Sequence, residues 1–274
     1  MRIDSHQHFW LMERRQGQWP PPDLAAICHD FLPGDIKAHL NRAGVQGTVV
    51  VQSLPDVDDT LFLLDLAGRN DFILGVVGWV DMKDQRAPEM IATLAVHPKF
   101  KGLRPMLQGI PDPDWIDDPI LAPAVAAMVD HDLAFDGLIL PHQMAPLTRF
   151  AARYPDLRVV IDHGAKPLIA EGRFVDWRKR LTALAELPNV SCKLSGLLVE
   201  AGEQRPEAVR PYAETILELF GPERVIWGSD WPVVNLVSDY QSWLDQCLDI
   251  VPAHHHDAVF GGNAINFYRL KSGR

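Results

Sequence analysis

The chain has 274 residues, of which 47% are aliphatic, aromatic or cysteine and 23% are charged, as in an ordinary globular enzyme. This length suits one large α/β barrel, so we expect a single domain over residues 1–274. The formal charge of −10 argues against nucleic acid as a partner, because phosphate binding needs clustered Lys and Arg.

Short apolar runs rich in Val, Ile or Leu recur along the chain and predict buried parallel strands. There are eight of them: Arg2–His8, Thr48–Ser53, Ile73–Asp81, Gly102–Gln108, Ala134–Leu140, Arg158–Gly164, Val190–Gly196 and Val225–Asp230. Amphipathic helices are predicted between and after them: Pro33–Ala43, Asp58–Gly68, Pro88–Val96, Pro119–Asp130, Pro146–Tyr154, Asp176–Leu187, Glu207–Phe220, Asp239–Val251 and His255–Leu270.

Strand–helix alternation predicts parallel βαβ units with right-handed crossovers. Eight such units close most naturally into a (β/α)8 TIM barrel, which is the predicted fold. An open doubly wound sheet is the alternative, but no Gly-rich dinucleotide fingerprint opens the first predicted helix.

The longest irregular stretch runs from Trp10 to Asp30 and contains Trp19 and three consecutive prolines. In a barrel it would be the first strand-to-helix loop, over the catalytic face, where long loops are often functional. A surface excursion without a function is the equal alternative.

The cysteines are three in number and widely spaced, which argues against a disulfide framework and against a Cys-based zinc site. Asp4, His6 and His8 fall where the apolar part of a signal peptide would begin. No apolar run approaches the roughly 20 residues that span a membrane. We therefore expect a cytoplasmic protein with no membrane partner, and homo-oligomerisation stays open.

Catalytic residues of such a barrel lie at the carboxyl ends of the strands. Asp4, His6 and His8 close the first predicted strand, and alternation places all three on one side. A His-x-His pair on a strand is a good start for a divalent-metal site, with incidental surface histidines as the alternative.

Two further candidates close later strands. His163 ends the sixth predicted strand after a β-branched apolar run, and Asp230 ends the eighth. Asp230 could ligate a metal and take a proton from water, or could simply cap a helix or form a turn. The conjunction of His6, His8, His163 and Asp230 at strand ends favours a catalytic site over any of these separate alternatives.

The local sequences around these residues are similar to the amidohydrolase superfamily, in its amidohydrolase-2 branch. Within that branch the chain resembles the sugar lactonases, a group with L-fuconolactonases, L-rhamnonolactonases, muconolactone lactonases and pyrone-dicarboxylate lactonases. The similarity runs through nearly the whole chain and is carried by Ile3–Trp10, Val51–Ser53, Gly102–Arg104, Asp162–Pro167, Cys192–Leu197, Gly228–Pro232, Gly262–Ala264 and Phe267–Tyr268.

The resemblance implies hydrolysis of a sugar lactone to the aldonic acid by an activated water, with Asp230 as general base. It implies one zinc or manganese ion on His6, His8 and Asp230, with His163 either a ligand or a carbonyl polariser. Arg104 stands where binuclear relatives carry a bridging Lys or Glu, which argues against two metals. Some relatives work without a metal, so a metal-free mechanism stays open.

Other side chains near predicted strand ends are candidates for substrate binding. His142 follows the fifth strand and is predicted to be a metal ligand, a substrate contact or a surface residue. Arg104 could hold the lactone carbonyl through its forked donors or pair with a nearby acid. Gln52 and Trp79 are predicted sugar contacts, Lys193 is ambiguous between substrate and structure, and Trp231 between packing and substrate.

The alternative functions include other enzymes of the same branch and a protein that only binds a ligand. A metal-dependent decarboxylase of the same branch would favour acidic substrates, and a hydrolase of another lactone is a closer variant. A barrel kept only as a binding scaffold has no need of histidines and an aspartate converging on its mouth. Fold alone does not separate these functions.

Overall fold

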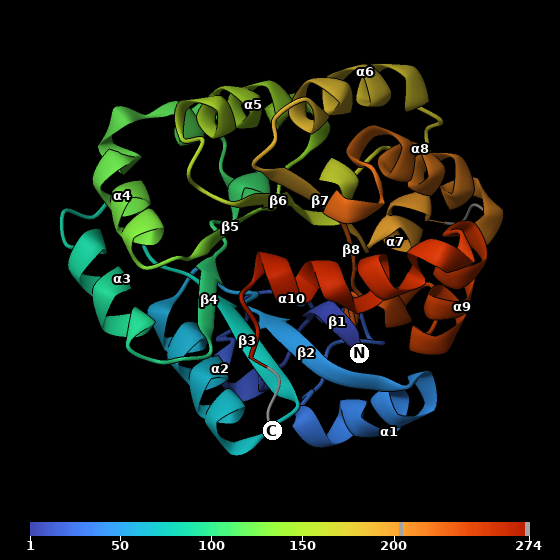
Figure 1. Ribbon diagram of the computed structural model, residues 1–274. Helices are drawn as coiled ribbons and strands as arrows, with labels where there is room; N and C mark the ends of the chain where they lie inside the picture. The colour runs from blue at the N-terminus through green and yellow to red at the C-terminus, as the bar shows by residue number, and fades with distance from the viewer. Residues whose placement is uncertain (203–204, 272–274) are drawn as a thin grey trace.

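The structure is a computed structural model that describes residues 1–202 and 205–271. Eight parallel strands form one sheet in the order β1 to β8, and helices cover its outside (Figure 1). The strands are β1 Arg2–Gln7, β2 Val45–Val51, β3 Ile73–Gly78, β4 Phe100–Leu103, β5 Ala134–Gly137, β6 Val159–Ile161, β7 Val190–Leu194 and β8 Val225–Trp227.

The (β/α)8 prediction is confirmed, although the elements differ from it in detail. The α-helices are α1 Pro33–Ala43, α2 Val57–Arg69, α3 Ala87–Ala95, α4 Ala122–Asp130, α5 Met144–Arg153, α6 Phe174–Ala185, α7 Leu197–Ala201, α8 Arg210–Phe220, α9 Tyr240–Ile250 and α10 Asn263–Phe267. Helix α7 was not predicted. The final helix, predicted over His255–Leu270, is helical over 256–267 and contains a π-helical turn, Ala258–Gly262, directly before α10.

Strands β1 and β8 close the barrel through a few contacts. The amide of Asp230 donates to the His6 carbonyl at 2.8 Å, and the amide of His8 donates to the Trp231 carbonyl at 2.8 Å. Gly228 is required here, since a Cβ on it would lie 2.6 Å from the Cβ of His6. The closure therefore brings the end of the last strand directly against the first His-x-His pair.

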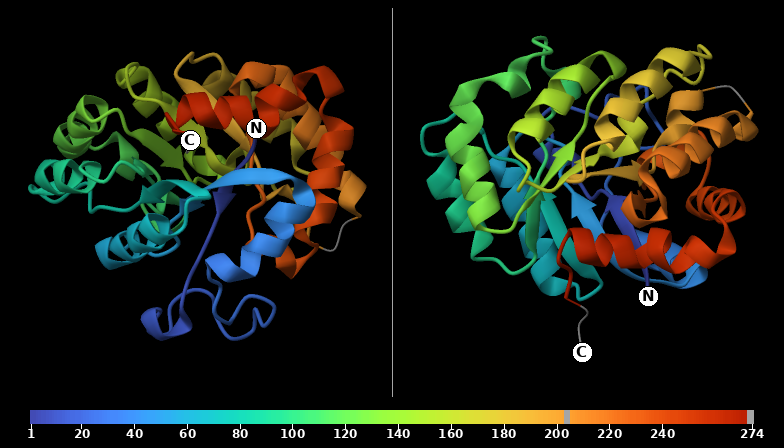
Figure 2. Two further views of the ribbon diagram at one scale, coloured as in Figure 1. Left: turned by 60° about the horizontal axis from the view of Figure 1, so that its bottom comes forward. Right: turned by 45° about the horizontal axis from the view of Figure 1, so that its top comes forward.

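The two ends of the barrel are covered differently. Helix α10 crosses the end where the N-terminus lies, and its Phe267 packs with Ile3 and Val160 inside the strands (Figure 1). The segment 8–32 projects from the carboxyl end of β1, on the side away from α10 (Figure 2, left). No helix among the described residues is long and apolar enough to span a bilayer.

Candidate active site

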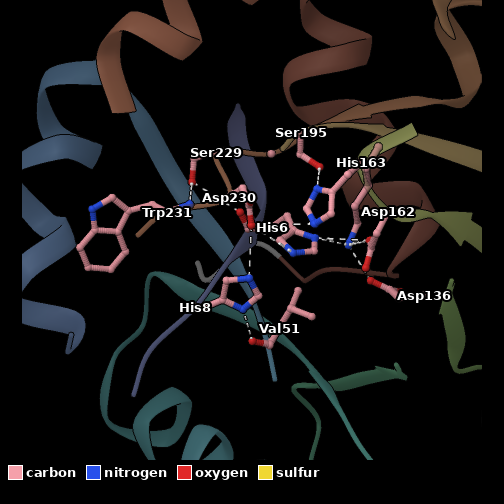
Figure 3. A network of polar contacts seen from close by, with 12 residues as sticks. His6, His8, Val51, Asp136, Asp162, His163, Ser195, Ser229, Asp230 and Trp231 are labelled. Carbon is pink, nitrogen blue, oxygen red and sulfur yellow. Dashed lines mark hydrogen bonds and ion pairs between the residues drawn. The ribbon is translucent and has the colours of Figure 1, made fainter. Parts of the chain in front are cut away.

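His6, His8, His163 and Asp230 meet inside the carboxyl end of the barrel (Figure 3). One oxygen of Asp230, Oδ1, lies 3.7 Å from His6 Nε2, 3.4 Å from His8 Nε2 and 3.9 Å from His163 Nε2. Each residue is at most 5% exposed. A single carboxylate oxygen thus faces imidazole nitrogens from strands that are far apart in the sequence.

The backbone at this site is held in an unusual conformation. His163 and Asp230 have φ values of 53° and 58°, in the left-handed region that side chains other than glycine rarely adopt. Such positions cost of order 1–3 kcal/mol and persist where the surrounding fold imposes them. His163 lies two residues after the end of β6 and Asp230 three residues after the end of β8, so the turn out of the barrel sets the direction of each side chain.

Hydrogen bonds on the outer ring nitrogens orient the imidazoles. His8 Nδ1 donates to the Val51 carbonyl at 2.7 Å, which leaves Nε2 as the ring atom that faces Asp230 and, in the neutral imidazole, as the one with a lone pair. His163 Nδ1 lies 2.9 Å from Ser195 Oγ. Gly196 makes room for this ring, because a Cβ there would lie 2.4 Å from His163 Nδ1 and the residue has a φ of 66°.

These atoms fit a divalent cation. The Nε2 atom of His6 is buried and has no hydrogen-bond partner among the described residues. His6, His8 and Asp230 offer ligand atoms that all lie within 4.8 Å of one another. Ligands of a tetrahedral zinc at 2.0–2.1 Å stand about 3.4 Å apart, close to the observed 3.4 and 3.7 Å. Without a proton or a cation between them, the lone pairs of His8 and Asp230 would repel.

A buried ionic network lies beneath the imidazole of His6. The Lys193 ammonium is 2.5 Å from Asp136 Oδ2, 3.0 Å from Asp162 Oδ1 and 3.0 Å from His6 Nδ1. Tyr268 donates to Asp136 Oδ2 at 2.7 Å. His6, Asp162 and His163 form a second group with metal-ligand spacing, but the ammonium already supplies a cation to that carboxylate.

Charges in this network set the pKa values of the buried groups. Burial raises the pKa of Asp136 to about 6, although Lys193 acts against it. Burial would also raise the pKa of Asp162, but the Lys193 ammonium and His6 hold it well below its usual range. Burial, assisted by the neighbouring Lys193, lowers the pKa of His6 far below that of a free imidazole.

Asp230 and His163 are coupled in the same way. Burial alone would raise the pKa of Asp230, yet the imidazoles of His163, His8 and His6 together hold it well below the usual carboxyl range. Burial lowers the pKa of His163 to about 4, against the opposing effect of Asp230. The carboxylate is therefore ionised and the His163 imidazole neutral near pH 7, the states that a general base and a metal ligand need.

A cavity of about 400 Å³ opens onto these residues and is lined by His8, His163, Asp230 and Arg104. Pockets of this size accept small organic ligands. The segment between β1 and α1 contributes Trp19 and Leu24 to its wall. The long first loop thus covers the catalytic face, as one of its two interpretations predicted.

Arg104 and Gln52 form reciprocal hydrogen bonds beside the cavity. Gln52 Nε2 donates to the Arg104 carbonyl at 2.6 Å, and Arg104 Nη2 donates to the Gln52 carbonyl. Arg104 Nη1 also lies 3.4 Å from Asp162 Oδ2, so the arginine has an acidic partner and a cavity position together. Gln52 is fully buried and is not among the cavity-lining residues, so the structure does not place it with the predicted sugar contacts at the cavity.

Lys193 and Trp231 do not line this cavity either. Lys193 is fully buried inside the barrel between carboxylates and is not among the residues that line the cavity. Trp231 is 2% exposed and its ring packs at 6.1 Å from Phe9 and 5.1 Å from Phe31. The positions of both residues favour the structural interpretation over substrate contact.

His142 and Trp79 lie outside the site. Strand β5 ends at Gly137, so His142 has already turned outward; it is exposed and borders a separate hollow beside α6. Strand β3 ends at Gly78, and the amide of Trp79 donates to Thr60 Oγ1 on α2 at 2.8 Å. The Trp79 ring borders a surface hollow next to α3. These positions place neither side chain at the cavity, and for His142 they agree with the surface alternative.

Alternation also failed at Asp4. A register shift interrupts the pairing of β1 with β2 between Asp4 and Gln7. As a result the Asp4 carboxylate does not join the imidazoles: it accepts from Ser229 Oγ at 2.6 Å and from the Tyr240 hydroxyl at 3.0 Å. Asp4 fastens β1 to the end of β8, and burial raises the pKa of its carboxyl to about 6 against these hydrogen bonds.

Comparisons with known proteins agree with this geometry. The family model described as Amidohydrolase matches residues 3–270. An L-fucono-1,5-lactonase of Burkholderia ambifaria is 54% identical over 98% of this chain and 96% of its own, and one of Burkholderia multivorans is 33% identical over the same shares. A crystal structure of an amidohydrolase from Burkholderia multivorans with bound zinc superposes with a TM-score of 0.92 at 33% identity, covering 99% of this chain and 100% of that one. The chain belongs to the amidohydrolase family.

Proposed function

We propose that this enzyme hydrolyses a sugar lactone, an aldonolactone such as L-fucono-1,5-lactone or L-rhamnonolactone, to the aldonic acid. The 54% identity to an L-fucono-1,5-lactonase over nearly the whole chain supports the substrate class. The observation that carries the chemistry is the buried, ionised Asp230 carboxylate facing His6, His8 and His163 at the end of a cavity.

Asp230 is the general base. Its carboxylate removes a proton from water as the water oxygen bonds to the lactone carbonyl carbon, giving a tetrahedral intermediate. The bond from that carbon to the ring oxygen then breaks. The same proton, held on Asp230, passes to the leaving alkoxide, so the ring opens to a hydroxy acid and the carboxylate returns to its starting state.

Arg104 stabilises the negative charge that develops on the carbonyl oxygen. Its guanidinium borders the cavity, and its buried Nε has no hydrogen-bond partner among residues 1–202 and 205–271. Donors that are already oriented toward developing charge in a water-poor site contribute strongly to catalysis. Asp162 and the Gln52 carbonyl keep the guanidinium in place.

His6, His8 and Asp230 are the residues that would hold a zinc or manganese ion, with His163 as a further ligand or as a polariser of the carbonyl. A divalent cation there would supply Lewis acidity and lower the pKa of a bound water. The general-base role of Asp230 does not depend on the cation, so a metal-free route remains part of the proposal.

Charge around the cavity favours a neutral lactone over an acidic substrate. Arg104 already pairs with Asp162, and Lys166 lies 2.8 Å from Glu200 Oε1. Among the described residues that line the cavity, these are the two with a permanent positive charge. A pyrone dicarboxylate or a decarboxylase substrate would bring negative charge to a wall whose cations are already paired.

A pH-indicator screen of aldonolactones tests the proposal, run with and without a chelator and with added zinc or manganese. We expect acid release above the spontaneous rate from L-fuconolactone or a stereochemical relative, and none from aromatic carboxylates assayed for decarboxylation. Absence of acid release from every aldonolactone, in all metal conditions, would contradict the proposal. The chelator arm shows whether the ion is needed.

A further inference from the structure

A second polar group lies in the wall of the same cavity, apart from the imidazoles. Lys166 follows His163 in the turn after β6, and Glu200 lies on α7 after β7. The Lys166 ammonium is 2.8 Å from Glu200 Oε1, and both side chains border the cavity. With side chains only 22% and 16% exposed, they form a partly desolvated pair and not an ordinary surface salt bridge.

The backbone connects this pair to the catalytic residues. The amide of Lys166 donates to the His163 carbonyl at 2.9 Å, and Lys166 has a φ of 49°, like the left-handed His163 before it. The amide of Ala170, in the same loop, donates to the Glu200 carbonyl at 3.1 Å. The two charged side chains are therefore fixed relative to His163 before any ligand arrives.

Within residues 1–202 and 205–271, neither side chain uses its full hydrogen-bonding capacity. An ammonium has three donors and a carboxylate has about four acceptor sites, and the ion pair needs one of each. Because both side chains line the cavity, adjacent hydroxyls of a ligand could accept from Lys166 and donate to Glu200. Hydroxyl groups are suited to this because each is a donor and an acceptor.

The rest of the cavity wall offers a sugar few polar partners for its hydroxyl groups. Much of it is apolar, formed by Leu24, Met106, Leu138, Val199, Val233 and Leu236. Ser53 Oγ already accepts from Arg15 at 2.8 Å. A hydroxyl buried against apolar groups without a partner costs free energy. Once the chemistry occupies His8, His163, Asp230 and Arg104, the polar side chains of the described wall that are left for the ring hydroxyls are Trp19, Gln108 and the charged pair Lys166 and Glu200. The pair is the charged part of this set.

We propose that the Lys166–Glu200 pair binds adjacent hydroxyls of the sugar lactone and determines which aldonolactones are accepted. This inference rests on the proposed function, because it needs a polyhydroxylated lactone as substrate. Charge-assisted hydrogen bonds contribute more than neutral ones. The pair thereby makes binding depend on the position of the hydroxyls, separately from the residues that act at the lactone carbonyl.

The experiment compares the parent aldonolactone with its monodeoxy analogues, each lacking one ring hydroxyl, in the wild type and in the variants Glu200→Gln and Lys166→Met. The matched control is Glu218→Gln, which removes the same charge from an exposed pair with Arg178 on the outer helices. Melting temperature is measured for each variant, and kcat/KM for each combination of variant and lactone.

We expect Glu200→Gln and Lys166→Met to lower kcat/KM for the parent lactone by about 10- to 100-fold. Removing a hydroxyl that the pair binds should cost a similar factor in the wild type and almost nothing further in the variants. Glu218→Gln should show wild-type values. Such non-additivity is not produced by a merely structural role.

Equal losses in the variants for the parent and every deoxy analogue would overturn the inference, since the pair would then act on the cavity as a whole. Near-normal turnover of the parent lactone by both variants would overturn it as well. A wild type that hydrolyses no aldonolactone contradicts the proposed function itself, and this inference with it. The first two outcomes leave lactone hydrolysis standing, so the two failures are distinguishable.

Discussion

The two ends of the barrel interior are built on opposite principles. At the end covered by α10, Ile3, Val160 and Phe267 belong to an apolar cluster in which side chains simply exclude water. At the other end, His163 and Asp230 are held in a left-handed backbone conformation and face one another across 3.9 Å. The apolar end stabilises the fold, and the other end holds polar groups in strained positions at the cost of some stability, as in other enzymes with this fold.

Lys193, Asp136 and Asp162 lie between these ends and separate them. Their charges are buried, yet each has an opposite partner within 3.0 Å. Breaking one partner of such a pair is costly because the other charge remains buried. The layer therefore lies between the two ends: it contacts the imidazole of His6 on one side and the apolar cluster through Tyr268 on the other.

The largest effect on activity is expected at the reactive end, from Asp230→Asn. The amide keeps the shape of the side chain but cannot accept the proton, so kcat should fall by about 10²–10⁴-fold. Lactone hydrolysis measured by acid release checks this, with circular dichroism to confirm the fold. Asp65→Asn, on the outer face of α2, is the matched control. Near-normal kcat in Asp230→Asn would remove this residue from the general-base role.

His8→Asn tests the cation site directly. The shorter amide can still donate to the Val51 carbonyl, as His8 Nδ1 does, but it has no atom in the place of Nε2. We expect zinc affinity to fall by more than about 100-fold, measured by competition with a chromogenic chelator. His142→Asn, exposed and outside the cavity, should bind zinc like the wild type. Equal affinities in the two variants would place any zinc elsewhere.

Arg104→Met should affect both the reactive end and the charged layer beneath it, because this arginine borders the cavity and also partners the buried Asp162. We expect kcat/KM to fall by about 10- to 100-fold, the range for a lost charged hydrogen bond. The free energy of unfolding should also fall by about 1–3 kcal/mol, since Asp162 loses a partner. Urea titration measures the second effect. A stability loss with normal kinetics would make Arg104 purely structural.

The fold and the residues that meet at the carboxyl end of the barrel were predictable from sequence. The residues that hold them in place, such as Asp136 and Gly196, were not. Apolar runs that end in His6, His163 and Asp230 mark strand ends because such polar groups would otherwise be unpaired in a core. Asp136 was missed, although a carboxylate inside the apolar run Ala134–Leu138 should have signalled a buried partner. Gly196 gave no signal, because only the position of the His163 ring shows why a side chain is excluded.

Directions of side chains just beyond the strands could not be predicted. Strand alternation holds only while the pleat continues, and β3 and β5 end at Gly78 and Gly137, before Trp79 and His142. In β1 a register shift between Asp4 and Gln7 interrupts the alternation, so the Asp4 side chain does not point to the same side as that of His6. These features depend on pairing between distant segments, which the sequence of one strand does not contain.

The smallest effect on turnover is expected at the opposite end of the barrel, from Phe267→Ala on α10. Phe267 is 8% exposed and packs in the apolar cluster that closes this end, so its truncation should cost about 3 kcal/mol of unfolding free energy. For a chain of this size the melting temperature should drop by roughly 6–12 °C. At 25 °C, where the variant stays folded, kcat/KM should remain within about twofold of the wild type, because the Lys193 layer separates this cluster from Asp230. Met90→Ala, at a partly exposed position on α3, is the control for a truncation with little packing to lose. A large fall in kcat/KM for Phe267→Ala would show that the apolar end positions the catalytic groups, through Tyr268 and Asp136, and that the two ends are not independent.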